Sequence, residues 1–270
     1  MSYANILVSV DLAETAPDRI RLAASLARRF DADLTGAAAA EVPAPLFAHD
    51  IRDAQAQFDR ARGEILQELE RARDVFARCA GETARTDWRG ATERPFVHII
   101  EQGRAADLLV VGRAAPGDLD PGPLGFALGP ILMEAGRPVL VVPPRVADLS
   151  GRRIVVAWKD TPEARRAVSG ALLFIRSADQ VFVVTAGEGA RFEGAQDVAR
   201  YLARHGASVT THLLTTTVSD GDAILRFARE QEADLIVMGA YGHSRLREWA
   251  FGGATRDVLQ STAICCLMAH

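Results

Sequence analysis

The sequence contains no apolar run of the roughly 18 residues that a membrane-spanning helix needs. It has no excess of basic residues either, because 31 lysines and arginines stand against 35 aspartates and glutamates. No charged leader precedes the first apolar run, and no small-residue cleavage site follows it. These absences argue against a membrane protein and against nucleic-acid binding, and we expect a cytoplasmic protein.

Cysteine is also scarce, with 3 residues in a chain of 270. Cys79 stands alone, whereas Cys265 and Cys266 are neighbours in a strand-like run and should point to opposite faces of a sheet. We interpret all three as buried thiols rather than as a redox or metal pair. The histidines show no metal-ligand spacing, so we expect no metal site.

Several catalytic templates are missing as well. The chain has no GxxxxGK(S/T) loop, and no GxGxxG follows the first strand expected in either half. Ser169 lacks the GxSxG context of a hydrolase elbow, and no pair of carboxylates can be assigned acid and base roles. The sequence therefore offers no catalytic residue, and we expect no efficient catalysis.

What the sequence does contain is an alternation of strand and helix patterns. Residues 6–10 are apolar and β-branched without alternation, as in a parallel strand that is covered on both faces. Apolar residues recur at helical spacing along 51–78, and we expect that stripe to face the core: Phe58, Ala61, Ile65, Leu69, Ala72 and Phe76. For the first half, the patterns predict strands at 6–10, 34–40, 84–88, 106–111 and 138–142 and helices at 17–30, 51–78 and 93–101.

The same order of elements begins again at Arg153. IVVAWKDTPEARRAV at 154–168 aligns with ILVSVDLAETAPDRI at 6–20, and ADLIVMG at 233–239 aligns with ADLLVVG at 106–112. This repeat predicts two α/β domains, residues 1–145 and 151–270, with parallel sheets and right-handed crossovers. For the second half, the patterns predict strands from 153 and at 180–185, 208–214, 235–238 and 264–268, and helices at 164–175, around 198–202 and at 222–230.

Four glycines stand out after the strand expected at 235–238. Gly239, Gly242 and Gly252 give the spacing G-x2-G-x9-G, and Gly253 follows directly before a helix-like segment. Bare backbone there would let phosphate oxygens approach, and the amides of residues 253–255 would meet them at a helix amino terminus. Alternatively, the glycines simply end strands and cap helices, because glycine spacing alone is a weak signal.

The stretch ADLIVMGAYGHSRLREWAFGGATRDVL resembles the nucleotide-binding signature of the universal stress protein family. The resemblance covers both halves and implies a tandem member, with two Rossmann-like (adenine-nucleotide alpha-hydrolase-like) α/β domains. Each domain would have a five-stranded parallel sheet sandwiched by helices, and the two would pack as an intramolecular pseudo-dimer in which 138–142 pairs with 264–268. It also implies ATP, ADP or AMP as the ligand, with Mg²⁺ bound only together with a nucleotide. The residues that would hold the nucleotide are Met238, Gly239, Gly242, His243, Ser244, Arg245, Gly252, Gly253, Ala254, Thr255, Ala157, Trp158, Lys159 and Asp160.

The second half departs from the family pattern at two positions. Gly253 replaces a small hydroxyl residue after the third glycine, and Lys159 replaces the acidic residue at the end of the first strand, with Asp160 one place later. A lysine there could neutralise a phosphate or another acidic ligand, or it could be an exposed charge at a strand end. The phosphate site is thus better supported than adenine specificity.

The first half departs in the opposite sense. Asp11 keeps the acidic position, but Ala115 replaces the second glycine and Phe126 follows the third. Prolines within that loop stiffen it and remove amide donors. We expect a degenerate site there, with the first half acting mainly as a structural partner.

The loop at 243–251 could contact bound phosphates through Arg245, His243 and Ser244. For Trp249 and Phe251 we favour packing on the neighbouring domain. We expect a regulatory protein whose nucleotide occupancy alters the surface offered to an unidentified protein partner, with a further homodimer left open. The alternatives are an interaction protein with vestigial pockets and a slow ATP hydrolase.

Overall fold

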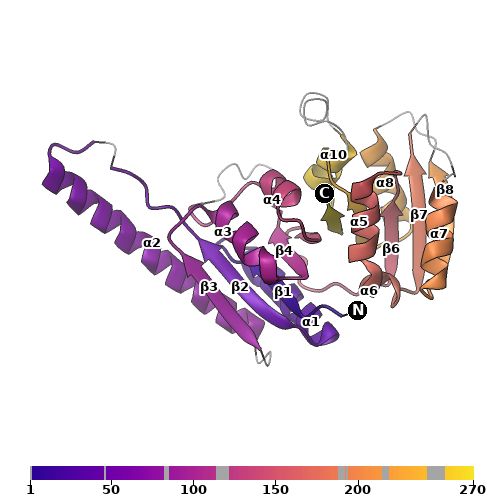
Figure 1. Cartoon of the computed structure of the whole chain (residues 1–270), viewed down its shortest axis with the longest axis horizontal. Helices are drawn as coiled ribbons and strands as arrows, with labels where there is room; N and C mark the ends of the chain where they lie inside the picture. The colour runs from indigo at the N-terminus through magenta and orange to yellow at the C-terminus, as the bar shows by residue number, and fades with distance from the viewer. Residues whose placement is uncertain are drawn as a thin grey trace.

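The computed structural model describes residues 2–45, 47–81, 85–113, 122–187, 192, 194–214, 219–241 and 253–270. Within these residues, ten strands form one continuous sheet in the order β3-β2-β1-β4-β5-β10-β9-β6-β7-β8. Strands β1–β5 belong to the first half of the chain and β6–β10 to the second, and the two sets lie side by side in Figure 1. The predicted α/β class is confirmed.

The first half follows the predicted order with small shifts of the boundaries. Its strands are β1 (Asn5–Ser9), β2 (Asp33–Ala39), β3 (Thr86–Ala91), β4 (Leu108–Gly112) and β5 (Val139–Val142). Its helices are α1 (Ala16–Phe30), α2 (Ile51–Ala80), α3 (Pro95–Gln102), the 3-10 turn η1 (Gly103–Ala105) and α4 (Leu128–Glu134).

The second half repeats that order. Its strands are β6 (Arg153–Ala157), β7 (Gln180–Ala186), β8 (Val209–Leu214), β9 (Leu235–Gly239) and β10 (Cys265–Ala269). Its helices are α5 (Pro162–Gly170), α6 (Leu172–Ile175), α7 (Ala195–Arg204), α8 (Asp220–Glu230) and α10 (Ala254–Ser261). The helix predicted at 164–175 is therefore two helices. Gly170 lies at the break, where a Cβ would come within 2.5 Å of Pro138 Cγ from the first half.

The two halves are joined at the centre of the sheet by β5 and β10. These strands run antiparallel, with Val141 opposite Cys266 and Val139 opposite Met268, whereas the strand pairs within each half are parallel. The pairing predicted between 138–142 and 264–268 is confirmed. Because each strand covers the edge of the other, neither half leaves its last strand unpaired.

Side chains of the first half also hold the second half directly. Arg113 donates to the carbonyl oxygens of Gln260 (2.9 Å) and Thr262 (2.9 Å), at the carboxyl end of α10. A guanidinium at this end of a helix is favourable because the last carbonyls carry partial negative charge. On the other side of the junction, the Tyr3 hydroxyl donates to the Gly170 carbonyl oxygen at 2.6 Å.

The sheet of the second half has helices on both faces. Ile154 and Val156 pack in the same cluster as Ala164 of α5 and Leu202 of α7. The residue between them, Val155, packs with α8 and α10 on the opposite face. Strand alternation also separates Cys265 from Cys266, which lie in different clusters, so the prediction for this buried pair is confirmed.

The stripe predicted along α2 is buried at four of its six residues. Ile65, Leu69 and Phe76 are buried, but the side chain of Phe58 is 37% exposed. A helix of 30 residues is roughly 45 Å long, so it is much longer than the strand it follows. Its amino-terminal part extends beyond the body of the molecule and has no layer to pack against (Figure 1).

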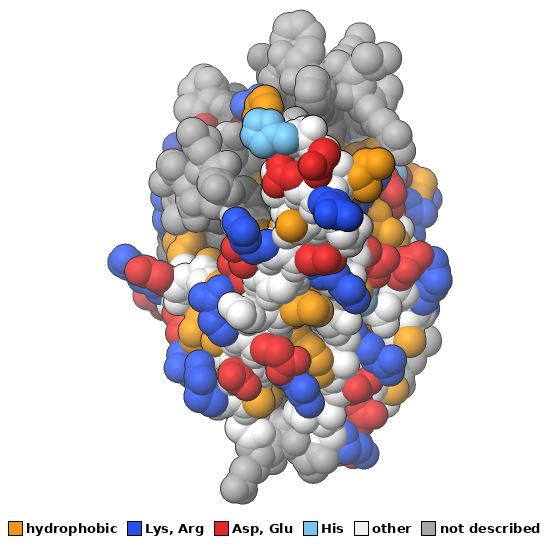
Figure 2. Space-filling model, turned by 90° about the vertical axis from the view of Figure 1, so that its left-hand side faces the viewer, with side chains coloured by type: hydrophobic (Ala, Val, Ile, Leu, Met, Phe, Trp, Pro, Cys, Tyr) orange, Lys and Arg blue, Asp and Glu red, His pale blue; other side chains and the backbone are white. Residues whose placement is uncertain are grey.

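The outer surface of the first half carries mixed charge. On the face shown in Figure 2, the coloured Lys and Arg side chains are interspersed with Asp and Glu side chains, and the apolar side chains form small separate groups. No helix in the described part of the chain has the length and apolar character of a membrane span.

Candidate functional site

The carboxyl ends of β6 and β9 lie next to each other in the second half. Ala157 is paired in register with Met238, so Gly239 comes directly beside the end of β6. A Cβ on Gly239 would lie 2.7 Å from the backbone nitrogen of Ala164, in the first turn of α5. Only glycine allows this approach, which brings a helix amino terminus against the end of the strand.

Helix α10 begins at the same edge. Gly253 is its N-cap residue, in an extended conformation, and no side chain of the described residues caps the helix. The backbone N–H of Tyr241, two residues past β9, donates to the hydroxyl oxygen of Thr255 at 3.4 Å. This bond ties the start of the glycine loop to the start of α10, and it uses the Thr255 hydroxyl, which is buried.

Of the fourteen residues predicted for the site, nine lie in the described part of the chain. The structure brings Met238, Gly239, Ala157 and the start of α10 together at one edge of the sheet. Lys159 is exposed at the end of β6. The following predicted residues lie outside the described residues, as do Trp249 and Phe251: Gly242, His243, Ser244, Arg245 and Gly252.

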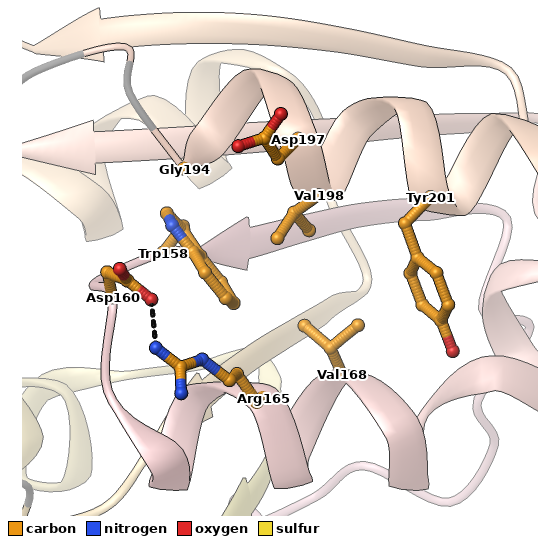
Figure 3. A pocket seen from close by; sticks show the side chains of 8 residues that line it. All are labelled: Trp158, Asp160, Arg165, Val168, Gly194, Asp197, Val198 and Tyr201. Carbon is orange, nitrogen blue, oxygen red and sulfur yellow. Dashed lines mark hydrogen bonds and ion pairs between the residues drawn. The ribbon is translucent and has the colours of Figure 1, made fainter.

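Trp158 and Asp160 turn to the face of the sheet that α5 and α7 cover. The Trp158 side chain lies between these two helices, and Asp160 pairs with Arg165 at 2.5 Å (Figure 3). The backbone of both residues follows β6 at the carboxyl edge, but their side chains line a separate groove. The sequence predicted that both residues follow the first strand of the second half, but it could not predict the direction of their side chains.

Glu163 is a residue of this edge that sequence reasoning missed. Its side chain is 14% exposed, Oε1 pairs with Arg166 at 3.1 Å, and Oε2 is buried with no partner among the described residues. Burial opposes ionisation, but hydrogen bonds from its own N–H and from Thr161, with the charges of Arg166 and His270, keep the pKa of Glu163 below its usual value. An acidic residue in the first turn of a helix is so common that its spacing gave no signal.

Comparison with known proteins identifies the family of this chain. The sequence model of the universal stress protein family matches residues 2–143 and again residues 151–270. The chain belongs to the universal stress protein family. A universal stress protein from Synechocystis is 25% identical over 166 residues, which make up 58% of this chain and 56% of that protein. That match thus spans little more than half of the relative's length.

Solved structures agree on the tandem arrangement. A universal stress protein from Archaeoglobus fulgidus has a similar structure, with a TM-score of 0.69 and 16% sequence identity. The match covers 98% of this chain and 95% of that protein's chain. A functionally unknown protein from Pseudomonas aeruginosa PAO1 covers 98% with 92% of its own, at a TM-score of 0.57 and 18% identity. At these identities the likeness establishes the fold: two universal-stress-type halves in one chain.

The equivalent edge of the first universal-stress-type half is filled by Arg19. Its side chain is 4% exposed, Nε donates to the Ser9 carbonyl oxygen at 2.9 Å, and Nη2 pairs with Asp11 at 2.8 Å. A Cβ on Gly112 would lie only 1.9 Å from Nη1, so the guanidinium rests on the glycine that corresponds to Gly239. In the second half, the repeat aligns Ala167 with Arg19, and a methyl group cannot reach this position.

Proposed function

We propose that the second half binds an adenine nucleotide, ATP, ADP or AMP, at its G-x2-G-x9-G loop. The observation that carries the proposal is the amino terminus of α10, which no side chain of the described residues caps and which is tied to the end of β9 through Tyr241 and Thr255. The first N–H groups of a helix and its dipole favour an anion. Membership of the universal stress protein family supports a nucleotide as that anion.

The charges at the edge favour one orientation of the ligand. Glu163 supplies negative charge beside Gly239 at the α5 side, which disfavours phosphates there. We therefore place the phosphates at the α10 side, on the amides of Gly253, Ala254 and Thr255, together with the loop residues Gly242, His243, Ser244, Arg245 and Gly252. The nucleoside then lies toward the ends of β6 and β9, beside Met238, Gly239 and the backbone of 157–160.

One nucleotide is expected for each chain, because Arg19 fills the corresponding edge of the first half. Magnesium enters only with a bound nucleotide, as a counterion of its phosphates. The role is regulatory: occupancy of the loop alters the surface that this cytoplasmic protein offers to a protein partner.

Calorimetry with ATP, ADP and AMP, together with analysis of small molecules released on denaturing the purified protein, tests this proposal. We expect saturable heat with at least one of the three and a stoichiometry of one. No heat with any of them, and no nucleotide released on denaturation, would leave the alternative of an interaction protein with vestigial pockets.

A further inference from the structure

A cavity of about 370 Å³ lies between α5 and α7 in the second half. Figure 3 shows Trp158 at its base, with Val168 and Val198 on its two helical walls and Tyr201 at one end. Its volume is at the lower end of the roughly 300–1,000 Å³ typical of small-molecule pockets. Aromatic and apolar walls with a few charged groups are the usual composition of such pockets.

This groove is separate from the glycine edge. Trp158 belongs to the cluster that packs under α5 and α7, whereas Ala157 and Val258 of α10 belong to the cluster on the opposite face of the sheet. A ligand between α5 and α7 and a phosphate at the start of α10 would therefore occupy different faces. Occupancy of the groove is therefore independent of nucleotide binding.

The indole N–H of Trp158 is the polar group that most needs a partner. The residue is 6% exposed, and its Nε1 atom is buried with no hydrogen-bond partner among the described residues. A buried N–H without an acceptor is rare in folded proteins. Gly194 lies beside this atom: a Cβ there would come within 3.2 Å of Nε1, and its φ of +74° also favours glycine. A side chain at this position would fill the space beside the N–H that a ligand oxygen needs.

The carboxylates of the groove are the groups that can accept a cation. Asp160 and Asp197 line the groove together with Arg165. Asp160 pairs with Arg165 and Asp197 with Arg200, and the side chains in both pairs are more than half exposed. Exposed pairs of this kind contribute little to stability and exchange partners readily. A positively charged ligand can therefore replace an arginine at either carboxylate at small cost.

We propose that the groove between α5 and α7 binds a small organic ammonium ion that also carries a hydroxyl or carbonyl oxygen. The oxygen accepts the hydrogen bond from Trp158 Nε1. The ammonium group lies between the carboxylates of Asp160 and Asp197 and against the rings of Trp158 and Tyr201, because aromatic faces attract cations.

Nuclear magnetic resonance of protein with ¹⁵N-labelled indoles tests this proposal with choline as the probe. The chain has 3 tryptophans, and Trp158→Phe identifies the signal of Trp158 by its loss. We expect choline to shift that signal in a saturable way. Tetramethylammonium, which has no oxygen, should bind without moving the indole proton downfield, and 3,3-dimethylbutan-1-ol, which has choline's shape and no charge, should not bind.

The carboxylates are tested by Asp197→Asn, which changes an exposed side chain and leaves the fold intact. Choline affinity should fall about two- to fivefold, because the quaternary ammonium loses an opposite charge at an exposed site and has no N–H with which to bond. Asp179→Asn is the matched control, because Asp179 is also exposed but lies before β7, outside the groove. An unmoved Trp158 signal, equal binding of the neutral alcohol, or unchanged affinity in Asp197→Asn would overturn the proposal.

Discussion

Arg19 of α1 lies against Gly112 at the end of β4, so close that a Cβ on the glycine would come within 1.9 Å of Nη1. The same guanidinium neutralises Asp11 through an ion pair of 2.8 Å. The corresponding glycine of the second half, Gly239, meets the backbone of Ala164 and the side chain of Glu163 instead of a guanidinium.

Removing the Arg19 side chain should destabilise the first half strongly. Arg19→Ala leaves Asp11 without its partner and empties a buried space, and breaking a buried pair in this way costs about 3–5 kcal/mol. We expect a loss near the lower end of that range, because the side chain of Asp11 is 21% exposed. Urea denaturation measures the difference in the free energy of unfolding.

The control for Arg19 is Arg21→Ala in the same helix. Arg21 pairs with Asp18 at the surface, with 55% and 29% of the two side chains exposed, and should contribute less than about 1 kcal/mol. Equal losses for the two variants would show that Arg19 does not act as a buried ion-pair partner.

Two glycines give opposite predictions for substitution by alanine. Gly239→Ala places a Cβ 2.7 Å from the backbone of Ala164, so α5 must shift, and overpacking of this kind costs about 1–3 kcal/mol. Gly63→Ala meets no atom within 4 Å inside α2 and should stabilise the protein by about 0.5–1 kcal/mol. Thermal unfolding of both variants checks the signs, and a neutral Gly239→Ala would refute the close approach of α5 to β9.

Tyr3 should make the junction of the halves sensitive to alkaline pH. Burial, and then the charge of Asp107, raises the pKa of Tyr3 above its ordinary value. The unfolded chain loses this proton near pH 10 while the folded protein keeps it, so stability is complete below about pH 10 and falls as the pH rises further. Tyr3→Phe should remove this part of the alkaline loss and cost about 1 kcal/mol at neutral pH, through the hydrogen bond to Gly170.

Urea denaturation between about pH 8 and pH 11 measures both effects of Tyr3. Tyr201→Phe is the matched control, because Tyr201 is 38% exposed and should leave the profile unchanged. Identical profiles for wild type and Tyr3→Phe would contradict a buried, protonated Tyr3.

The thiols should differ in reactivity. Cys265 and Cys266 are 1% and 0% exposed, and burial raises the pKa of Cys266 to about 12. Cys79 is only partly buried, so the expectation of three buried thiols is wrong for this residue. Iodoacetamide should therefore modify Cys79 alone in the folded protein and all three cysteines in urea, as measured by peptide mass spectrometry. Modification of Cys266 under native conditions would mean that the central β5–β10 pair opens readily.

The order of the elements could be predicted from the sequence because the repeat and the apolar runs are local patterns. The pairing of β5 with β10 also followed, through the resemblance to a family. Phe58 shows where such patterns fail: the apolar period of α2 continues past the point at which the sheet beneath it ends. Periodicity marks a face of a helix but does not reveal what covers it.

The candidate site was predictable at its backbone and not at its side chains. Gly239, whose close approach to α5 requires glycine, and Gly253, the N-cap of α10, both belong to the spacing read from the sequence. The direction of Trp158, the buried oxygen of Glu163 and the position of Arg19 over Gly112 depend on neighbours that are distant in sequence. No local pattern in this chain carries that information.

The N-cap of α10 offers the most direct test of nucleotide binding. Gly253→Asp introduces a preferred N-cap residue, so the helix should be retained, while its carboxylate occupies and repels the phosphate position. Ala127→Asp makes the same change at the N-cap of α4, the counterpart in the first half. In calorimetry with ATP, the account predicts that Gly253→Asp abolishes binding and that Ala127→Asp leaves one nucleotide bound per chain. Binding that survives Gly253→Asp, or that is lost in Ala127→Asp alone, would contradict it.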